Sequence, residues 1–327
     1  MINGERYIQT IDAHTMGEAA RIVVDGLPPI RGKTMMEKKQ YMQLHMDDIR
    51  KFLMHEPRGH LNMFGAILTE PCASNCDFGV LFMDSGGYLN MCGHGTIASV
   101  TIAINRGLIP KKDSVFIDTP SGIVECQVAY ENNKVKEVSF INVPAFLFEQ
   151  DVDIVVENIG PIKVDIAFGG SFFAIVDAGQ LNLELDIDEQ RHLADLGMAI
   201  KKAVNEQINV KHPELPEINT VDLVEFSIEA GSNHYRNVVV FGEGQIDRSP
   251  CGTGTCAKLS TLDLQPGEHI IQESIIGSTF KGTVIGQTTV AGFPASVPKV
   301  TGSAWMTGMH QFVLEDTDPY TEGFLLK

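Results

Sequence analysis

Two cysteines occupy equivalent positions in a short motif that occurs twice in this chain. The motif reads C-G-x-G-T-x-A, and its two copies begin at Cys92 and Cys251, nearly half the chain apart. Each copy follows a stretch that contains Gly and Asp, and each precedes a segment with helical periodicity. An internal repeat of this kind predicts a duplicated fold in which each half contributes one cysteine.

The glycines of both motifs indicate an anion site at the start of a helix. The first turn of a helix leaves backbone N–H groups without intrahelical acceptors and carries the positive end of the helix dipole. Gly93 and Gly95 in the first copy, and Gly252 and Gly254 in the second, let a ligand approach the backbone closely. The pattern therefore favours a carboxylate held by main-chain donors.

The same location changes the acidity of a thiol. An unperturbed cysteine has a pKa near ~8.5, and a helix N-terminus lowers it. Because the dipole supplies at most ~2 kcal/mol, it lowers the pKa by about one unit. We expect hydrogen bonds or the charge of a substrate to provide any further stabilisation of a thiolate at Cys92 and Cys251.

Two thiols on opposite sides of one carbon suit the inversion of a stereocentre. One of them, as thiolate, removes the α-proton, and the other, as thiol, delivers a proton to the opposite face. Since two like charges in one pocket disfavour each other, we expect the pair to share one proton. N–H groups around the substrate carboxylate would stabilise the developing carbanion, and closure of two lobes would exclude water.

Other readings of the cysteines are weaker. We interpret Cys72, Cys76 and Cys126 as small buried hydrophobic residues, and we expect Cys256 to pack on the helix away from Cys251. A zinc site built from Cys92, His94, Cys251 and Cys256 is disfavoured, because the flanking glycines suit an anion better than a closed tetrahedral cage. The glycine motifs match neither a P-loop nor a dinucleotide fingerprint. We therefore expect no metal and no cofactor.

Length and charge narrow the class of protein. The 327 residues favour two domains, and no apolar run is long enough to cross a bilayer. The net charge of −17 argues against a nucleic-acid partner, because phosphate contacts need clustered Lys and Arg. The N-terminal residues lack the layout of a secretory signal, so we expect a cytoplasmic protein with reduced thiols and no membrane partner.

Strands dominate the expected secondary structure, because most apolar segments are short and β-branched and are bounded by Gly, Pro or Asp. The clearest expected strands cover residues 19–24, 78–83, 115–118, 123–130, 137–143, 163–167, 237–241 and 300–306. Apolar residues at three- and four-residue intervals predict helices over residues 35–54, 96–106 and 188–208.

With these residues in hand, the chain resembles the proline racemase family over almost its whole length. The stretches IDAHTMGEAARIV, EPRGHLNMFGA, FMDSGGYLNMCGHGTIA, FGGSFFAIV and DRSPCGTGT carry the resemblance. It implies an α/β (α+β), diaminopimelate-epimerase-like fold of two pseudo-symmetric lobes, each a mixed, barrel-like sheet around a central helix, with the active site between them. The N-terminal lobe would comprise residues 1–122 plus 302–327, and the C-terminal lobe residues 123–301.

The resemblance also implies roles for individual residues. Cys92 and Cys251 would be the two acid–base groups, with the substrate nitrogen contacted by His94 and Asp247. The carboxylate would be held by backbone groups of Gly93, His94 and Gly95 from one lobe and of Gly252, Thr253 and Gly254 from the other. A carboxylate four residues before Cys251 suits a secondary ammonium group, although a role for Asp247 in a turn also fits the sequence.

Substrate choice depends on the walls of the pocket. By the resemblance, Phe64 and Phe241 would form apolar walls, with Leu223 as a further candidate, although ordinary core packing is the commoner fate of Phe. A hydroxyl buried against such walls without a partner costs about 1 to 3 kcal/mol. We therefore expect proline as the substrate, and a homodimer as the family suggests.

Three other functions remain open at this point. A 4-hydroxyproline 2-epimerase would use the same two thiols on a ring that carries a hydroxyl. A trans-3-hydroxyproline dehydratase, by the resemblance, would lack one thiol, whereas both are present here. A non-enzymatic amino-acid-binding protein would need the glycine-rich helix starts but not the two cysteines.

Overall fold

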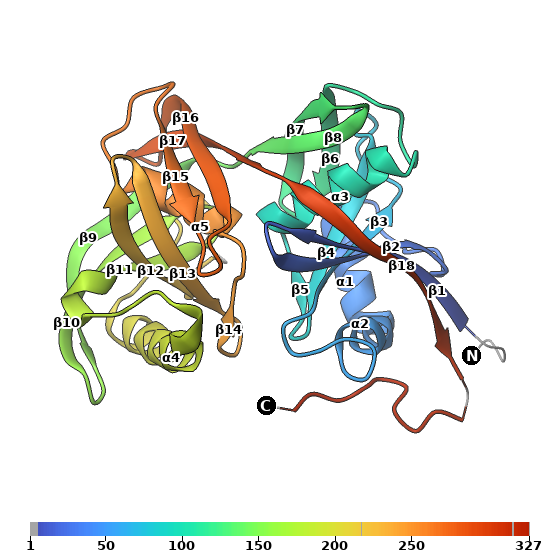
Figure 1. Cartoon of the computed structure of the whole chain (residues 1–327), viewed down its shortest axis with the longest axis horizontal. Coiled ribbons are helices and arrows are strands. Elements are labelled where there is room, and N and C mark those ends of the chain that lie inside the picture. Colours follow the sequence, from blue (N-terminus) through green and yellow to red (C-terminus); the bar gives the residue numbers. More distant parts are fainter. Residues whose placement is uncertain (1–5, 217, 316, 327) are drawn as a thin grey trace. The chain divides into compact units, whose positions relative to one another are not determined.

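The computed structural model describes residues 6–216, 218–315 and 317–326, and these fold into two compact units. The first unit holds the described residues of Met1–Phe140 and Ser303–Lys327, and the second holds Ile141–Gly302. As expected, the last part of the chain therefore returns to the N-terminal unit. Both units are built mainly from strands (Figure 1).

The elements of the two units follow in chain order. The first unit contains the strands β1 (Arg6–Thr15), β2 (Glu18–Asp25), β3 (Phe64–Thr69), β4 (Phe78–Asp84), β5 (Tyr88–Leu89), β6 (Ser114–Thr119), β7 (Gly122–Glu131), β8 (Lys134–Ile141) and β18 (Ala304–Leu314), and the helices α1 (Met35–His45), α2 (Asp47–Met54) and α3 (Gly93–Asn105). The second contains the strands β9 (Ala145–Val156), β10 (Gly160–Phe168), β11 (Phe172–Asp177), β12 (Val221–Gly231), β13 (His234–Phe241), β14 (Gln245–Ile246), β15 (His269–Glu273), β16 (Thr279–Val290) and β17 (Phe293–Gly302), the 3₁₀ helices η1 (Ala178–Leu181) and η2 (Ile187–Glu189), and the helices α4 (Gln190–Gln207) and α5 (Gly252–Ser260).

The two units repeat one pairing scheme. In the first unit the strands pair in the order β18, β1, β2, β3, β4, β6, β7, β8, and in the second in the order β9, β10, β11, β12, β13, β15, β16, β17. The third and fifth pairs of each series are parallel and the others antiparallel. In the second unit, β17 also pairs with β9 and closes the sheet into a barrel. The duplication expected from the cysteine motifs thus extends to the sheet topology.

Each unit encloses one helix that begins directly after a motif cysteine. Helix α3 contacts β1, β2, β3 and β18, and α5 contacts β9, β10, β16 and β17. All residues of α3 except Asn105 are buried, which explains why its sequence is apolar on every side. The fold is therefore mixed and rich in strands, and it agrees with the diaminopimelate-epimerase-like fold that the family resemblance implied.

Several boundaries differ from those expected. The domain boundary lies near residue 140 rather than 122, because β7 and β8 continue the sheet of the first unit through β6. The single helix expected over residues 35–54 is two helices, because Met46 leaves the helical conformation and Asp47 and Asp48 start a new first turn. The strand expected over 300–306 is interrupted at Ser303, where the chain passes from β17 to β18.

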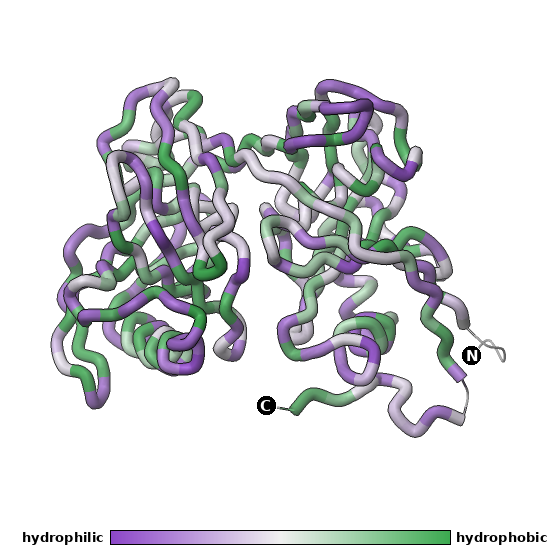
Figure 2. The backbone as a smooth tube through the Cα atoms, viewed as in Figure 1, coloured by the Kyte–Doolittle hydropathy of each residue, from purple (hydrophilic) through white to green (hydrophobic). Residues whose placement is uncertain are grey.

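Helix α3 begins three residues before the expected start at residue 96. The reason is that Cys92 itself caps the helix, so the motif glycine Gly93 is already helical. In β7 the buried Val124, Cys126 and Val128 alternate with more exposed residues, and hydrophobic and hydrophilic stretches follow one another along both units (Figure 2). Within the described residues, no helix is both long and apolar enough to span a membrane.

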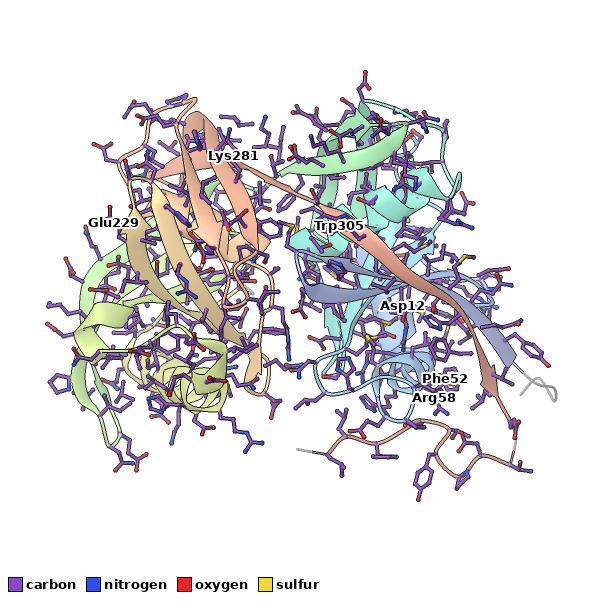
Figure 3. All side chains as sticks on the ribbon, in the orientation of Figure 1. Asp12, Phe52, Arg58, Glu229, Lys281 and Trp305 are labelled. Atoms are coloured by element: carbon purple, nitrogen blue, oxygen red, sulfur yellow. The ribbon has the colours of Figure 1, made fainter. Side chains whose placement is uncertain are left out.

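In the first unit, a buried and a half-buried arginine connect segments that are distant in the sequence. Arg58 stacks 4.1 Å from the centre of the Phe52 ring and donates to Asp318 Oδ2, which holds the C-terminal segment against α2 (Figure 3). Arg21, 5% exposed, donates from Nη2 to Asp12 Oδ2 at 2.9 Å and from Nη1 to the carbonyl oxygen of Leu53 at 2.6 Å. Arg21 thereby joins β1, β2 and α2.

Arg21→Met should lower the free energy of unfolding by about 3 to 5 kcal/mol, because it leaves the half-buried Asp12 carboxylate without its arginine and the Leu53 and Arg58 carbonyls without this donor. Urea unfolding, followed by the fluorescence of Trp305, the one tryptophan of the chain, measures the change. Lys136→Met, which removes an exposed cation, is the control and should leave the urea midpoint unchanged. Equal midpoints for both variants would contradict this role of Arg21.

Candidate active site

Cys92 is the N-cap residue of α3. Its backbone is extended, with φ −152° and ψ 127°, and its Sγ accepts a hydrogen bond from the Gly95 N–H at 3.4 Å. The thiol takes the place that a Ser or Asp side chain usually fills at a helix start. The thiol lies next to the positive end of the helix dipole, and the first turn of this helix contains no acidic residue.

The imidazole of His94 faces the Cys92 thiol. His94 Nδ1 lies 3.2 Å from Cys92 Sγ, and the Thr15 hydroxyl donates to the His94 carbonyl oxygen at 2.8 Å. Burial lowers the pKa of His94 to about 3, so the ring is neutral at physiological pH. Phe64 packs edge-on against this ring with the centroids 4.3 Å apart. A neutral imidazole thus has both a donor and an acceptor nitrogen beside the thiol.

Gly95 is required by the packing of Phe64. A Cβ at residue 95 would lie 2.8 Å from the Phe64 ring and 3.0 Å from Phe82. The second motif glycine therefore lets an aromatic side chain lie directly against the first turn of α3.

Cys251 is the N-cap residue of α5, and its Sγ accepts from the Gly254 N–H at 3.3 Å. Its φ of 62° places a non-glycine residue in the left-handed region, which costs of order 1 to 3 kcal/mol. The Ser249 hydroxyl accepts from the Cys251 N–H at 3.2 Å, and the Thr255 hydroxyl donates to the Cys251 carbonyl at 2.7 Å. These contacts hold the strained residue in place.

Asp247 lies buried in the turn before Cys251. Its Oδ1 accepts from the Ser249 N–H at 2.8 Å, so it is both a turn residue and a neighbour of the thiol. Burial raises the pKa of Asp247 to about 6, against the lowering effect of the hydrogen bonds from Ser249 and Cys251. Its carboxylate is therefore mostly ionised at neutral pH.

The sequence predicted a lowered pKa for both thiols, and for Cys251 this is wrong. Burial raises the pKa of Cys251 well above its ordinary value, and the negative charge of Asp247 raises it further. The Gly254 N–H and the Thr253 hydroxyl lower the pKa, but by less than burial raises it. Desolvation thus exceeds the effect of the helix end, and Cys251 is a thiol rather than a thiolate at neutral pH.

The two helix starts leave backbone donors available. The N–H groups of Gly93 and His94, and those of Gly252 and Thr253, have no acceptor among the residues that the structure describes. Both sets lie in the first turn beside a motif thiol, where helix geometry leaves N–H groups unpaired. Each unit therefore holds a local arrangement of thiol and N–H donors that can bind a carboxylate.

The proposed pocket walls lie close to the motifs. Phe64, at the start of β3, is 3% exposed and contacts His94. Leu223 on β12 packs in the apolar cluster that includes Cys251. Phe241 is half-buried at the end of β13, in the hairpin that leads to Asp247.

The other cysteines divide into buried and accessible ones. Cys126 is fully buried, and Cys256 is too, with its pKa raised by burial to about 12, in line with a packing role. Cys72 is exposed and Cys76 is half-buried, so the expectation of buried residues is wrong for Cys72. Within the described residues, no group of three or more His, Cys, Asp or Glu side chains is arranged to hold a metal ion.

Sequence reasoning missed several supporting residues. Thr15 holds the His94 carbonyl, and Asn142 donates to the Gly169 carbonyl at 2.7 Å. A Cβ on Gly169 would lie only 2.3 Å from the Thr253 carbonyl oxygen. The loop at Phe168, Gly169 and Gly170, called the FGG loop, therefore packs against the start of α5. Glu225, fully buried on β12, also lies beside this helix start. Each of these contacts joins segments that are distant in the sequence, so no local pattern predicts it. The one available signal was the pair of glycines in the FGG loop, which indicates close packing of its backbone.

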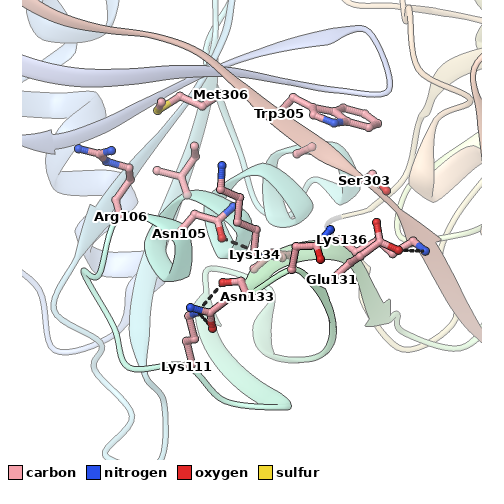
Figure 4. Close-up of a pocket in the computed structure, with 14 residues that line it drawn as sticks. Asn105, Arg106, Lys111, Glu131, Asn133, Lys134, Lys136, Ser303, Trp305 and Met306 are labelled. Atoms are coloured by element: carbon pink, nitrogen blue, oxygen red, sulfur yellow. Dashed lines mark hydrogen bonds and ion pairs between the residues drawn. The ribbon is translucent and has the colours of Figure 1, made fainter.

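A pocket of about 1070 Å³ in the first unit lies apart from these residues (Figure 4). It is lined by the C-terminal end of α3, the β7–β8 turn and the first residues of β18. Two of the lysines that line it have partners: Lys136 forms an ion pair with Glu131 at 3.0 Å, and Lys111 donates to Asn133. A 13-residue helix is about 20 Å long, so this pocket and Cys92 lie at opposite ends of α3.

Comparison with known proteins gives one family for nearly the whole chain. The sequence profile described as Proline racemase matches residues 10–325. A proline racemase of Clostridioides difficile is 50% identical, with 98% of this chain and 99% of that protein covered. A trans-3-hydroxy-L-proline dehydratase of Bacillus thuringiensis is 43% identical, with 97% of each chain covered.

Solved structures agree with the fold. A crystal structure of a hydroxyproline epimerase from Agrobacterium vitis, with bound trans-4-hydroxy-L-proline, superposes with a TM-score of 0.90. It is 33% identical to this chain, and the match covers 98% of this chain and 96% of the epimerase.

Gly254→Ala tests the close packing around Cys251. Alanine normally stabilises a helix relative to glycine by up to about 1 kcal/mol, but here the added Cβ would lie 2.6 Å from Glu225 Oε2 and 3.2 Å from Cys251 Sγ. We expect a loss of about 1 to 3 kcal/mol in urea unfolding. Gly87→Ala, whose Cβ would meet no atom within 4 Å, is the control. A stabilised Gly254→Ala variant would show that this packing is loose.

Proposed function

The chain belongs to the proline racemase family and is an isomerase of the amino-acid racemase and epimerase type, and from this premise we propose that it interconverts L- and D-proline by proton transfer between two cysteines. Cys92 and Cys251 are the two acid–base groups of this proposal. The substrate is a free amino acid, and the reaction needs neither a cofactor nor a metal.

One observation carries the proposal: both motif cysteines cap a helix in the same way. In each unit the thiol accepts from the N–H three residues later, and unpaired N–H groups of the same turn lie beside it. A protein that only binds carboxylates needs the N–H groups but has no use for a thiol at both positions. The repeated thiol therefore supports acid–base chemistry over simple binding.

In the proposed reaction, a thiolate removes the α-proton and becomes a thiol. The electron pair of the broken C–H bond moves into the carboxylate, and the second thiol delivers its proton to the opposite face and becomes the thiolate. Because the free protein keeps Cys251 protonated, Cys251 delivers the proton in the direction in which Cys92 starts as the thiolate. The roles exchange in the reverse direction.

The remaining site residues bind the substrate in this proposal. In this proposal the N–H groups of Gly93 and His94 and of Gly252 and Thr253 donate to the carboxylate, where negative charge accumulates in the carbanion. Those of Gly95 and Gly254, which the sequence also suggested, donate to the motif thiols in the substrate-free protein. Asp247 is largely ionised at neutral pH and suits the secondary ammonium group as a charge-assisted acceptor. His94, held neutral by burial, can accept from the same group without repelling it.

In this proposal the bound ammonium group also lowers the pKa of Cys251. A positive charge near the thiol favours the thiolate, and pairing with Asp247 offsets the negative charge that raises the pKa of Cys251. Thiolate formation at Cys251 would then follow substrate binding rather than precede it.

The aromatic contacts favour proline over hydroxyproline. Phe64 covers the first turn of α3 and is itself paired with the His94 ring, so this side of the proposed pocket is apolar. A ring hydroxyl placed there would lose its hydrogen bonds to water at a cost of about 1 to 3 kcal/mol. The second candidate is 4-hydroxyproline 2-epimerisation, which the likeness to the Agrobacterium vitis enzyme supports.

The reduced protein should racemise L-proline and leave trans-4-hydroxy-L-proline unchanged, or turn it over at least about tenfold more slowly, in keeping with the cost of the buried hydroxyl. Polarimetry with each amino acid measures both activities. Turnover of hydroxyproline alone would establish the epimerase instead and remove Phe64 and Phe241 as specificity residues. Formation of a cyclic imine from trans-3-hydroxy-L-proline would indicate a dehydratase.

Cys92→Ser and Cys251→Ser should each reduce racemisation by at least about a hundredfold, because a serine hydroxyl cannot replace a thiol as an acid–base group near neutral pH. Circular dichroism checks that both variants keep the fold. Cys72→Ser changes an exposed thiol outside both motifs and should keep full activity. Normal racemisation by either motif variant would exclude the two-thiol mechanism.

A homodimer and a cytoplasmic location remain predictions of the sequence and the family. Light scattering of the purified protein tests the first, and a mass of twice 35.8 kDa is expected.

A further inference from the structure

Glu225 is a fully buried carboxyl for which the proposed reaction has no use. It lies in the middle of β12, between Ile175 of β11 and Val239 of β13 in the sheet. A buried carboxylate without an ion pair is costly. Its place beside the start of α5, close to Cys251, suggests a physical role.

The hydrogen bonds around Glu225 show a shortage of donors. Gln272 Nε2 donates to Glu225 Oε1 at 2.7 Å, and Asn237 Nδ2 donates to the Pro250 carbonyl oxygen at 2.8 Å. Three buried oxygens remain without a donor among the described residues: Glu225 Oε2, Asn237 Oδ1 and Gln272 Oε1. A proton on Glu225 Oε2 would turn one of these acceptors into a donor for one of the two amide oxygens, since a protonated carboxyl has one O–H.

This cluster is connected to Cys251 through the backbone. Asn237 lies beside the Glu225 carboxyl and holds the carbonyl of Pro250, the residue before Cys251. Cys251 has the unfavourable φ of 62°, so its position depends on how firmly the preceding turn is held.

The carboxyl is also close enough to act on the thiol through its charge. The position that a Cβ would take on Gly254 lies 2.6 Å from Glu225 Oε2 and 3.2 Å from Cys251 Sγ. The two atoms are therefore no more than about 6 Å apart. An ionised Glu225 would oppose a thiolate at Cys251.

We propose that Glu225 is a positioning residue for Cys251 and works with a proton on its carboxyl. The neutral carboxyl adds a donor to the cluster of Glu225, Asn237 and Gln272, in which Asn237 holds the turn at Pro250. It also keeps a second negative charge away from the Cys251 thiolate. When Glu225 ionises, thiolate formation at Cys251 becomes harder.

The electrostatic surroundings agree with this assignment. Burial raises the pKa of Glu225 to about 7, and the charge of Lys258 on α5, the hydrogen bond from Gln272 and the nearby amide of Asn237 offset only part of that effect. The charged groups acting on Cys251 are Asp247, from the preceding turn, and Glu225, from β12. Glu225 therefore changes charge within the pH range in which the protein would work.

The test compares Glu225→Gln with the parent protein, because glutamine mimics the protonated carboxyl at every pH. The rate at which a thiosulfonate reagent modifies Cys251 is measured from pH 5.5 to 8.5. Trypsin releases the peptide between Arg248 and Lys258, and fragment masses separate Cys251 from Cys256. This inference rests on the proposed acid–base use of Cys251, but the readout needs no substrate, so its failure and that of the proposed function are distinguishable.

We expect the two proteins to react at equal rates at pH 5.5, where Glu225 is neutral in the parent. At pH 8.5 the variant should react at least about threefold faster, since at about 6 Å a unit charge has that effect even with the screening of bulk water. The ratio of the rates should rise with a midpoint near pH 7. A purely structural role would change the ratio equally at all pH values.

Glu229→Gln is the matched control, because it removes the same charge from an exposed position on the same strand (Figure 3). The rate at which Cys251 is modified in Glu229→Gln, divided by the rate in the parent protein, should stay at one from pH 5.5 to 8.5. If Glu225→Gln does not fold, Glu225→Met also removes the charge, and the same rise of the ratio with pH is expected. A ratio independent of pH in the folded variant would overturn the proposal.

Discussion

The hydrogen bond from a helix N–H to a cysteine sulfur is the interaction on which the rest of the site depends. It occurs twice, from Gly95 to Cys92 and from Gly254 to Cys251. It forms because a thiol replaces the usual N-cap side chain, and glycine at the third position of each helix leaves room for Phe64 beside Gly95 and for Glu225 beside Gly254. The surrounding sheets repeat the same pairing order, and each contacts one such helix.

Burial sets the chemistry of both thiol sites. It holds His94 neutral and raises the pKa values of Asp247, Glu225 and Cys251. A helix end offsets little of this, because its contribution to the pKa is about one unit. The substrate-free protein is therefore in a resting state in which Cys251 carries its proton. In the proposed reaction a bound amino acid would change that balance, because its ammonium group would pair with Asp247 and favour the thiolate.

The sequence predicted the parts of this protein that a local pattern determines. The cysteine motifs gave the duplication, the two helix starts and the residues beside them, and the family resemblance gave the fold. The direction of the Cys251 pKa shift was wrong, since burial arises from the packing of distant strands and leaves no mark in the motif. Glu225 was not predicted for the same reason: in the segment VDLVEF it reads as the outward residue of an alternating strand. The interruption at Met46 was also missed, because the apolar periodicity continues through it.

The fate of solvent deuterium tests the two-thiol account most directly. L-proline is incubated with the protein in heavy water, and the α-deuterium content of both enantiomers is measured by mass spectrometry after the first few per cent of conversion. If two different groups remove and deliver the proton, nearly every newly formed D-proline molecule carries deuterium while the remaining L-proline carries none. Equal early labelling of both enantiomers would show that a single group serves both faces, and it would contradict the account.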